Sequence, residues 1–464
     1  MAEHPSEQAA LDADRRAREF LVALPQLRFV QGILARTTPD KDGLGPIPVD
    51  GTPDFSEALG LARVRLENLD QAAAAIRARV DANAEATAWH RRAEQRLTDT
   101  TRLTDTTNEA DATGTMDRFL LGLRALIAGE TAGWTPTLGK NRLTGSVIGG
   151  GTIRHSGGAP RGVTKELPIR GTGPGRGVRV GVLDTAFAPQ SWLSGGWVAR
   201  YSDLMHDSDP YRPAAGHATF VAGLVLSQAP GATVEVRGIL DKNGQADSWT
   251  VANEIVALGR AGVDILNLSL GCYTEDGDAP LAMAAAIDRL DPNIVVVAAA
   301  GNHGKPNAEP AARRRPAYPA ALDDVVAVGS ANRRGERSPF TPPDVPWIDL
   351  LTYGEDVVST FLDGNVEIRR RDEEDGEEDT NGDEVLRTES FTGAASWSGT
   401  SFASALVSGA IAAGTQPGRV SAHQAWEDIR SSLQRSMRDA DPAEPSLPPL
   451  LRLNVTFADP SNPG

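Results

Sequence analysis

The sequence VRVGVLD, which forms residues Val178–Asp184, decides the fold of the larger part of this chain. It is the first of five short apolar runs that alternate with alanine-rich stretches of helical character. The runs are Val178–Leu183, Val234–Ile239, Ile265–Leu270, Ile294–Ala299 and Val325–Gly329. A strand that is apolar at every position is buried on both faces, so this alternation predicts a mostly parallel sheet with helices on both sides. We therefore expect an α/β fold of three layers.

Composition and charge narrow the class of protein. The chain has 464 residues, of which 40% are hydrophobic and 23% charged, as is typical of globular proteins with more than one domain. The formal net charge of -16 argues against nucleic-acid binding, which requires concentrated lysine and arginine. Cys272 is the single cysteine of the chain, so an intrachain disulfide is excluded.

The sequence also gives expectations about location. The first residues, MAEHPSEQAALDADRRAREFLVALPQL, lack the basic segment and uninterrupted apolar core of a secretory signal. Apolar stretches such as Ile294–Ala300 are far too short to span a membrane. We expect a cytoplasmic protein that is not bound to a membrane.

The N-terminal region, residues 1–144, has the periodicity of helices. Apolar residues recur at spacings of three and four in the segments Ala13–Leu34, Phe55–Leu97 and Met116–Ala128. This pattern predicts a helical hairpin or small bundle. Residues 145–177 are rich in glycine and proline and are expected to form a linker or an extended segment before a domain at 178–455.

Four residues of the α/β region carry chemistry, each at the end of an apolar run or the start of a helix. Asp184 ends VRVGVLD, His217 begins HATFVAGLVLSQA, Asn302 follows VVVAAAG, and Ser401 begins a helix rich in small residues. Each also has a structural interpretation as a helix cap, a turn residue or a core residue. Together they are the groups that a hydroxyl nucleophile needs: a base, a carboxylate that orients it, and donors for an oxyanion.

The segments VGVLDTAF, GHATFVAG, DILNLSLG, VAAAGNHG and SGTSFASA, in this order, resemble the motifs of the subtilisin-like (S8) serine peptidases, of the intracellular bacterial type. The resemblance covers residues from about Val178 to Gly414. It implies a hydrolase that cleaves peptide bonds through an acyl-enzyme. In that case Asp184 orients His217, His217 acts as general base and then acid, and Ser401 is the nucleophile. Asn302 and the backbone N–H of Ser401 would form the oxyanion hole.

The resemblance also implies how a substrate would bind. An extended peptide is expected to add as a strand along Ser269, Leu270 and Gly271, and the wall of the specificity pocket is expected at Ala299, Ala300 and Gly301. No cofactor is expected in catalysis, whereas a structural calcium ion is common in the family.

Two kinds of departure from the family pattern stand out. Ala186, Ala218 and Ala405 replace the glycine, glycine and proline that are common there, which tightens the space around the reactive groups without removing one. An acidic insertion at about residues 361–393 precedes the Ser401 motif. We expect it to be solvated and disordered, and gating of the cleft is a further hypothesis for it. It does not have the ligand spacing of an EF-hand calcium loop.

Two questions remain open at the level of sequence. The N-terminal region is either an inhibitory prosegment, a partner-binding domain or a packing element, and we favour partner binding or regulation. The rival to a peptidase is a catalytically silent subtilisin-like protein that binds peptides or acts as a scaffold. The presence of all four reactive groups counts against that rival.

Overall fold

A computed structural model of the chain describes residues 14–36, 45–101, 110–146, 158–163, 167–206, 210–274, 277–306, 308–369, 386–438 and 448–458. These residues form two compact units. The first consists of Met1–Leu143, Asp247–Val256 and Thr274–Arg289, and the second of Thr144–Ala246, Ala257–Tyr273 and Leu290–Gly464. The second unit contains the segments that carry Asp184, His217, Asn302 and Ser401.

A seven-stranded sheet is the centre of the second unit, with the strand order β16-β15-β13-β11-β7-β9-β8. All of its strand pairs are parallel. The strands are β7 (Arg179–Thr185), β8 (Trp197–Ala199), β9 (Thr233–Leu240), β11 (Ile265–Leu268), β13 (Val295–Ala299), β15 (Val325–Ala331) and β16 (Leu350–Tyr353). The predicted parallel sheet is confirmed, and each of the five predicted runs overlaps one of these strands.

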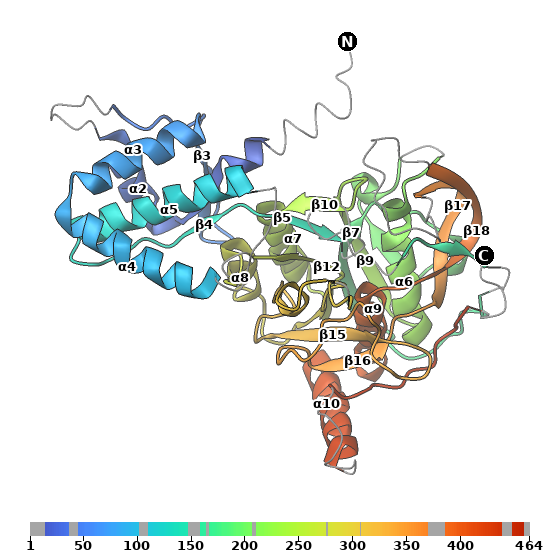
Figure 1. Ribbon diagram of the computed structural model, residues 1–464. Coiled ribbons are helices and arrows are strands. Elements are labelled where there is room, and N and C mark those ends of the chain that lie inside the picture. The colour runs from blue at the N-terminus through green and yellow to red at the C-terminus, as the bar shows by residue number, and fades with distance from the viewer. Residues whose placement is uncertain are drawn as a thin grey trace. The chain divides into compact units, whose positions relative to one another are not determined.

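Helices cover both faces of this sheet. On one face α9 (Thr400–Gly414) packs over β11, β13 and β15, and α6 (His217–Gln228) lies beside α9 over β7 and β9 (Figure 1). On the other face the C-terminal half of α7 (Ser248–Ala261) covers β7, because a Cβ atom at Gly181 would lie 3.1 Å from Leu258 Cδ1. The predicted three-layer α/β architecture is therefore present. Helix α10 (Ala422–Arg438) packs against α9.

A long hairpin packs on α6 and carries part of the predicted insertion. Strands β17 (Val357–Arg369) and β18 (Leu386–Trp397) pair antiparallel, and β6 (Arg161–Gly162) adds to β18. The hydroxyls of Ser359 and Thr360 donate to backbone carbonyls of α6 at 2.8 and 2.7 Å. The flanks of the insertion, predicted to be solvated, are thus strands, because their alternating apolar side chains face the core. The charged run 370–385 lies outside the described residues.

A small sheet of the second unit has the strand order β10-β5-β12-β14. Its strands are β10 (Gln245–Asp247), β5 (Leu143–Ser146), β12 (Leu270–Tyr273) and β14 (Ala317–Tyr318). Strand β5 pairs antiparallel with β12, with Ser146 opposite Leu270 and Gly145 opposite Gly271. The start of the predicted linker is therefore a strand inside a sheet.

The first unit combines helices with a four-stranded antiparallel sheet of order β2-β3-β1-β4. The strands are β1 (Glu19–Ala23), β2 (Asp54–Ser56), β3 (Leu61–Arg65) and β4 (Leu138–Lys140). The helices are α2 (Leu27–Ala35), α3 (Leu69–Asp81), α4 (Ala84–Thr101), α5 (Ala110–Glu130) and α8 (Leu281–Ile287). Helices α3, α4 and α5 pack on one another, which confirms the predicted small bundle.

The sheet of the first unit was not predicted. The helix expected over Ala13–Leu34 is interrupted by strand β1 at Glu19–Ala23, and the helix expected from Phe55 begins only at Leu69, after two strands. Short apolar runs such as EFLVA satisfy helical and strand spacing equally well. The pairing of Leu21 with Arg63 and with Gly139 decides in favour of a strand.

Within the described part of the chain, no helix has both the length and the apolar character needed to cross a membrane.

Candidate active site

Asp184 and His217 form a buried pair at the carboxyl edge of the seven-stranded sheet. Asp184 is the penultimate residue of β7, and His217 is the first residue of α6. The His217 Nδ1 atom lies 2.7 Å from Asp184 Oδ1 and 2.8 Å from Oδ2, and both side chains are fully buried. Because a carboxylate can only accept, Nδ1 carries the hydrogen in this pair. Asp184 Oδ1 also accepts the backbone N–H of Thr185 at 2.7 Å, which fixes the carboxylate.

The other ring nitrogen of His217, Nε2, is the free one. It is buried and has no hydrogen-bond partner among the residues described in the structure. With the proton on Nδ1, Nε2 has a lone pair that can accept a proton. Nε2 is therefore the ring nitrogen of His217 that is able to act as a base.

Aromatic side chains hold the imidazole ring of His217 in place. The ring stands edge-on to Trp397, with centroids 5.9 Å apart and an interplanar angle of 89°, and it is tilted against Phe402 at 5.5 Å. Behind it, a Cβ atom at Gly216 would lie 2.1 Å from the Phe361 ring, so only glycine fits before the histidine. The imidazole is therefore confined by packing as well as by its hydrogen bonds.

Ser401 lies in the first turn of α9, next to Phe402. Its hydroxyl donates to the backbone carbonyl of Ser269 at 3.3 Å. Its own carbonyl accepts the hydroxyls of Ser269 at 3.0 Å and Ser404 at 2.9 Å. The backbone N–H groups of a first turn have no partner within the helix, so the N–H of Ser401 belongs to a set that favours negative charge.

Asn302 follows β13 and is tied to the residue before Ser401. Its Oδ1 atom accepts the backbone N–H of Thr400 at 3.0 Å and the Thr400 hydroxyl at 3.1 Å. The neighbouring Gly301 N–H donates to the same hydroxyl at 3.1 Å. These bonds use the oxygen of the Asn302 amide. Its nitrogen, Nδ2, lies beside Gly399. The amide thus presents a donor near the start of α9.

The predicted substrate-binding edge is already paired with a strand of this chain. Ser269 precedes β12, which contains Leu270 and Gly271, and β5 lies along it. Since the pairing is antiparallel, β5 runs toward the Ser269 end of β12. The Ser269 carbonyl is the acceptor of the Ser401 hydroxyl. The carboxyl end of β5 is thus directed toward Ser401.

The predicted pocket wall backs onto an aromatic pair that the sequence did not reveal. Ala299 ends β13, and Ala299, Ala300 and Gly301 are all buried. The rings of Tyr273 and His303 are 4.3 Å apart, and a Cβ atom at Gly301 would lie within 2.9 Å of both. Burial raises the pKa of the Tyr273 hydroxyl, so this group stays neutral. Gly301, with a φ of 93°, is the residue that leaves room for the pair.

Comparison with known proteins places the chain in a family. The model of the subtilase family matches residues 175–448, more than half of the chain. The chain belongs to the subtilase family.

Individual relatives of this subtilase match over shorter stretches. A thermostable alkaline protease of Halalkalibacterium halodurans is 31% identical over 198 residues, which are 40% of this chain and 50% of the relative. Subtilisin E of Bacillus subtilis is 28% identical over 203 residues, which are 41% of this chain and 50% of the relative. The chain spans about half the length of these curated relatives.

Solved structures match this chain with lower sequence identity. A cold adapted subtilisin-like serine proteinase has a TM-score of 0.42 and 21% identity, covering 58% of this chain and 87% of that chain. A lanthipeptide protease has a TM-score of 0.40 and 22% identity, covering 55% of this chain and 79% of that chain.

Several residues that shape the site of this subtilase were missed at the level of sequence. They are Thr185, Trp397 and Thr400, together with Phe402. Thr185 follows Asp184, and Thr400 and Phe402 flank Ser401. Their position next to a predicted site residue was the sequence signal that could have identified them. Trp397 gave none, because its contact with His217 joins residues 180 positions apart.

No group of three or more histidine, cysteine, aspartate or glutamate side chains is placed to hold a metal ion within the described ranges. We therefore assign no calcium site to these residues.

Proposed function

We propose that this subtilase is a serine endopeptidase that cleaves extended peptide or protein segments through an acyl-enzyme. The observation that carries the proposal is the state of His217. Its Nδ1 atom is held by both oxygens of Asp184, and its buried Nε2 atom is left without a partner. This is the arrangement of a general base whose orientation and tautomer are set by a carboxylate. Membership of the subtilase family supports the same chemistry.

In this mechanism Ser401 Oγ attacks the carbonyl carbon of the scissile peptide while His217 Nε2 takes the hydroxyl proton. Asp184 stabilises the imidazolium that forms. The oxyanion accepts hydrogen bonds from Asn302 Nδ2 and the Ser401 N–H. His217 then gives the proton to the leaving amine, and water releases the acyl group by the reverse sequence.

The hydroxyl of Ser401 must change its partner before it reacts. In the structure it donates to the Ser269 carbonyl, and the reaction requires it to donate to His217 Nε2. Rotation about the Cα–Cβ bond moves a serine hydroxyl between such positions. Catalytic hydrogen bonds commonly form only when substrate is bound, so this starting position is compatible with the mechanism.

A fluorophosphonate probe tests the proposed nucleophile. Such probes phosphonylate a serine only when a base activates it, so we expect covalent labelling at Ser401, located by peptide mass spectrometry. The variant Ser401→Ala should remain unlabelled. If folded protein in which the N-terminal segment has been removed is not labelled, the chain is a catalytically silent peptide-binding protein and the peptidase assignment is wrong.

We further propose that the N-terminal segment inhibits this site by occupying the substrate-binding edge. Strand β5 already makes the pairing with β12 that an extended substrate would make. Its carboxyl end points toward Ser401, so the peptide bond after Ser146 is the candidate for self-cleavage. This favours an inhibitory prosegment over the alternative that the N-terminal helices only bind a partner.

Mass spectrometry of the purified chain tests this second proposal. The wild type should separate into two fragments with a break between residues 145 and 177, and the break after Ser146 should come first. The variant Ser401→Ala should keep the full mass of 49.0 kDa. A wild type that labels with fluorophosphonate but never cleaves itself here would contradict the role of β5 as a bound substrate.

A further inference from the structure

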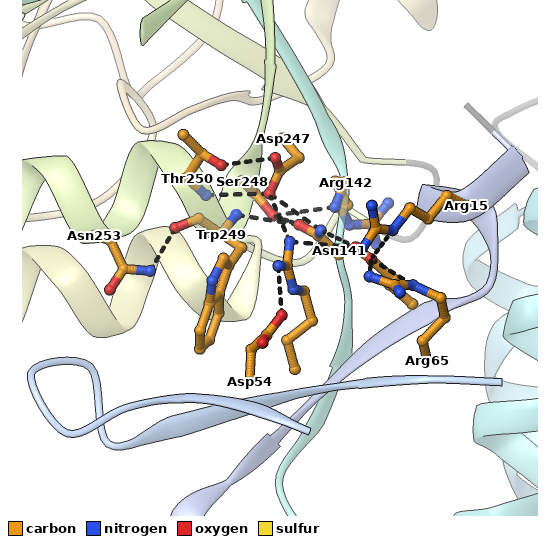
Figure 2. A network of polar contacts seen from close by, with 12 residues as sticks. Arg15, Asp54, Arg65, Asn141, Arg142, Asp247, Ser248, Trp249, Thr250 and Asn253 are labelled. Atoms are coloured by element: carbon orange, nitrogen blue, oxygen red, sulfur yellow. Dashed lines mark hydrogen bonds and ion pairs between the residues drawn. The ribbon is translucent and has the colours of Figure 1, made fainter. Parts of the chain in front are cut away.

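Asn141 is the centre of a buried cluster of polar contacts that immediately precedes β5 (Figure 2). Its Oδ1 atom accepts the Ser248 hydroxyl and the Trp249 backbone N–H, both at 3.1 Å. Its Nδ2 atom donates to Asp247 Oδ1 at 3.1 Å and to Glu19 Oε2 at 2.7 Å. All four hydrogen-bonding positions of the amide are therefore used.

The backbone of Arg142 extends the same attachment. Its N–H donates to Ser248 Oγ at 3.0 Å, and its carbonyl accepts the Ser248 N–H at 2.8 Å. The first N–H groups of a helix need acceptors from outside the helix. In α7, the N–H groups of Ser248 and Trp249 find their acceptors in Arg142 and Asn141. The next N–H group, that of Thr250, donates to Asp247 Oδ1 at 3.1 Å. The first turn of α7 thus depends on the segment that leads into β5.

Charged side chains surround the side-chain amide of Asn141. Glu19 is only 4% exposed and accepts two hydrogen bonds from Arg65, at 2.7 and 3.0 Å. The Arg63 guanidinium lies over the Trp249 ring at 5.6 Å and bonds Asp54 at 2.6 Å. Asn141 therefore donates to carboxylates on two sides, one from β1 and one from the residue before α7. A buried amide in such a network is costly to release, because every partner would lose a bond.

We propose that Asn141 is a latch that keeps β5 on the substrate-binding edge, so that loosening its bonds to α7 uncovers this edge and raises peptidase activity. The proposal rests on the proposed function and adds the regulation of its site. Residues 141 and 142 lie outside the stretch that matches the subtilase family, whereas residues 247–249 lie inside it. The latch therefore joins the N-terminal segment to the family domain at the two residues before β5.

Two substitutions separate the halves of the latch. Asn141→Ala removes all four bonds. Asn141→Asp keeps acceptor oxygens for α7 but loses both donors and places a third carboxylate beside Glu19 and Asp247. The matched control is Asn68→Ala, because Asn68 caps α3 in the same unit by accepting the Gln71 N–H at 2.9 Å. It loses a helix cap without touching the latch.

The first measurement is backbone amide hydrogen exchange of residues 143–146 and 270–273 in full-length chains that also carry Ser401→Ala, so that none cleaves itself. We expect exchange in these strands to rise about five- to thirty-fold for Asn141→Ala, the size expected from loss of one helix cap. Asn141→Asp should exceed this, since like charges repel in a buried site. Exchange in the Asn68→Ala variant should equal that of the chain that carries Ser401→Ala alone.

The second measurement is hydrolysis of a peptide substrate by the same variants with Ser401 restored, where the initial rate should rise in the same order. Unchanged exchange, or an equal rise for Asn68→Ala, would show that Asn141 is not a latch, whatever the activity. Faster exchange without faster hydrolysis, in chains that label with fluorophosphonate, would refute the regulation and leave the peptidase function standing. If no variant labels, even after its N-terminal segment has been removed, both proposals fail.

Discussion

Replacing Ser401 by alanine is expected to abolish nearly all peptide hydrolysis, lowering kcat/KM by about 10⁶-fold. This is the size of effect found when the triad serine of a subtilisin is removed. The physical reason is that no acyl-enzyme can form, while the substrate edge on β12 and the Asn302 donor remain. A residual rate of about 10³- to 10⁴-fold over the uncatalysed reaction should persist, since oxyanion stabilisation and binding do not require the hydroxyl.

The matched control for this prediction is Ser408→Ala. Ser408 lies two turns further along α9, is equally buried, and donates to Asn267 Oδ1 at 3.0 Å. The Ser408→Ala variant also loses a hydroxyl oxygen from α9, and it should retain kcat/KM close to the wild-type value. The measurement is steady-state hydrolysis of the best substrate from a peptide library. Equal activity of Ser401→Ala and Ser408→Ala would remove Ser401 from the mechanism.

Replacing Asp184 by asparagine should lower kcat/KM by about 10⁴-fold. The carboxylate accepts the Nδ1 hydrogen of His217 through both oxygens, at 2.7 and 2.8 Å. An amide at this position can offer its N–H₂ group instead, which favours the tautomer that carries its hydrogen on Nε2. That tautomer cannot take the proton of Ser401. It also lacks the negative charge that stabilises the imidazolium.

Asp264→Asn is the control for the loss of a carboxylate from the same sheet. Asp264 lies at the opposite, amino edge, just before β11, where it accepts the Arg179 backbone N–H at 2.8 Å. An asparagine there can still accept this bond, so activity should hold. Thermal unfolding of both variants would show whether each is folded. A folded Asp184→Asn variant with activity near the wild-type value would mean that another residue orients His217.

The sequence by itself determined the central sheet and indicated the candidate catalytic residues. Runs such as VRVGVLD and NIVVVAAA are apolar at every position, and burial on both faces in a parallel sheet is the arrangement that accommodates them. Asp184, His217, Asn302 and Ser401 were recognisable because each stands where such a run or a small-residue helix ends or begins. These signals are local, so they can be read along the chain.

Tertiary structure decided the features that depend on residues distant in sequence. Leu21 pairs with Arg63 and Gly139, so EFLVA became a strand although its spacing also fits a helix. Ser146 lies opposite Leu270, which turned part of a glycine-rich linker into a strand on the expected substrate edge. Asn141 belongs to no sequence motif that we recognised. Its role follows from four bonds that reach up to 122 positions along the chain, and hydrogen bonding over such separations leaves no local periodicity to detect.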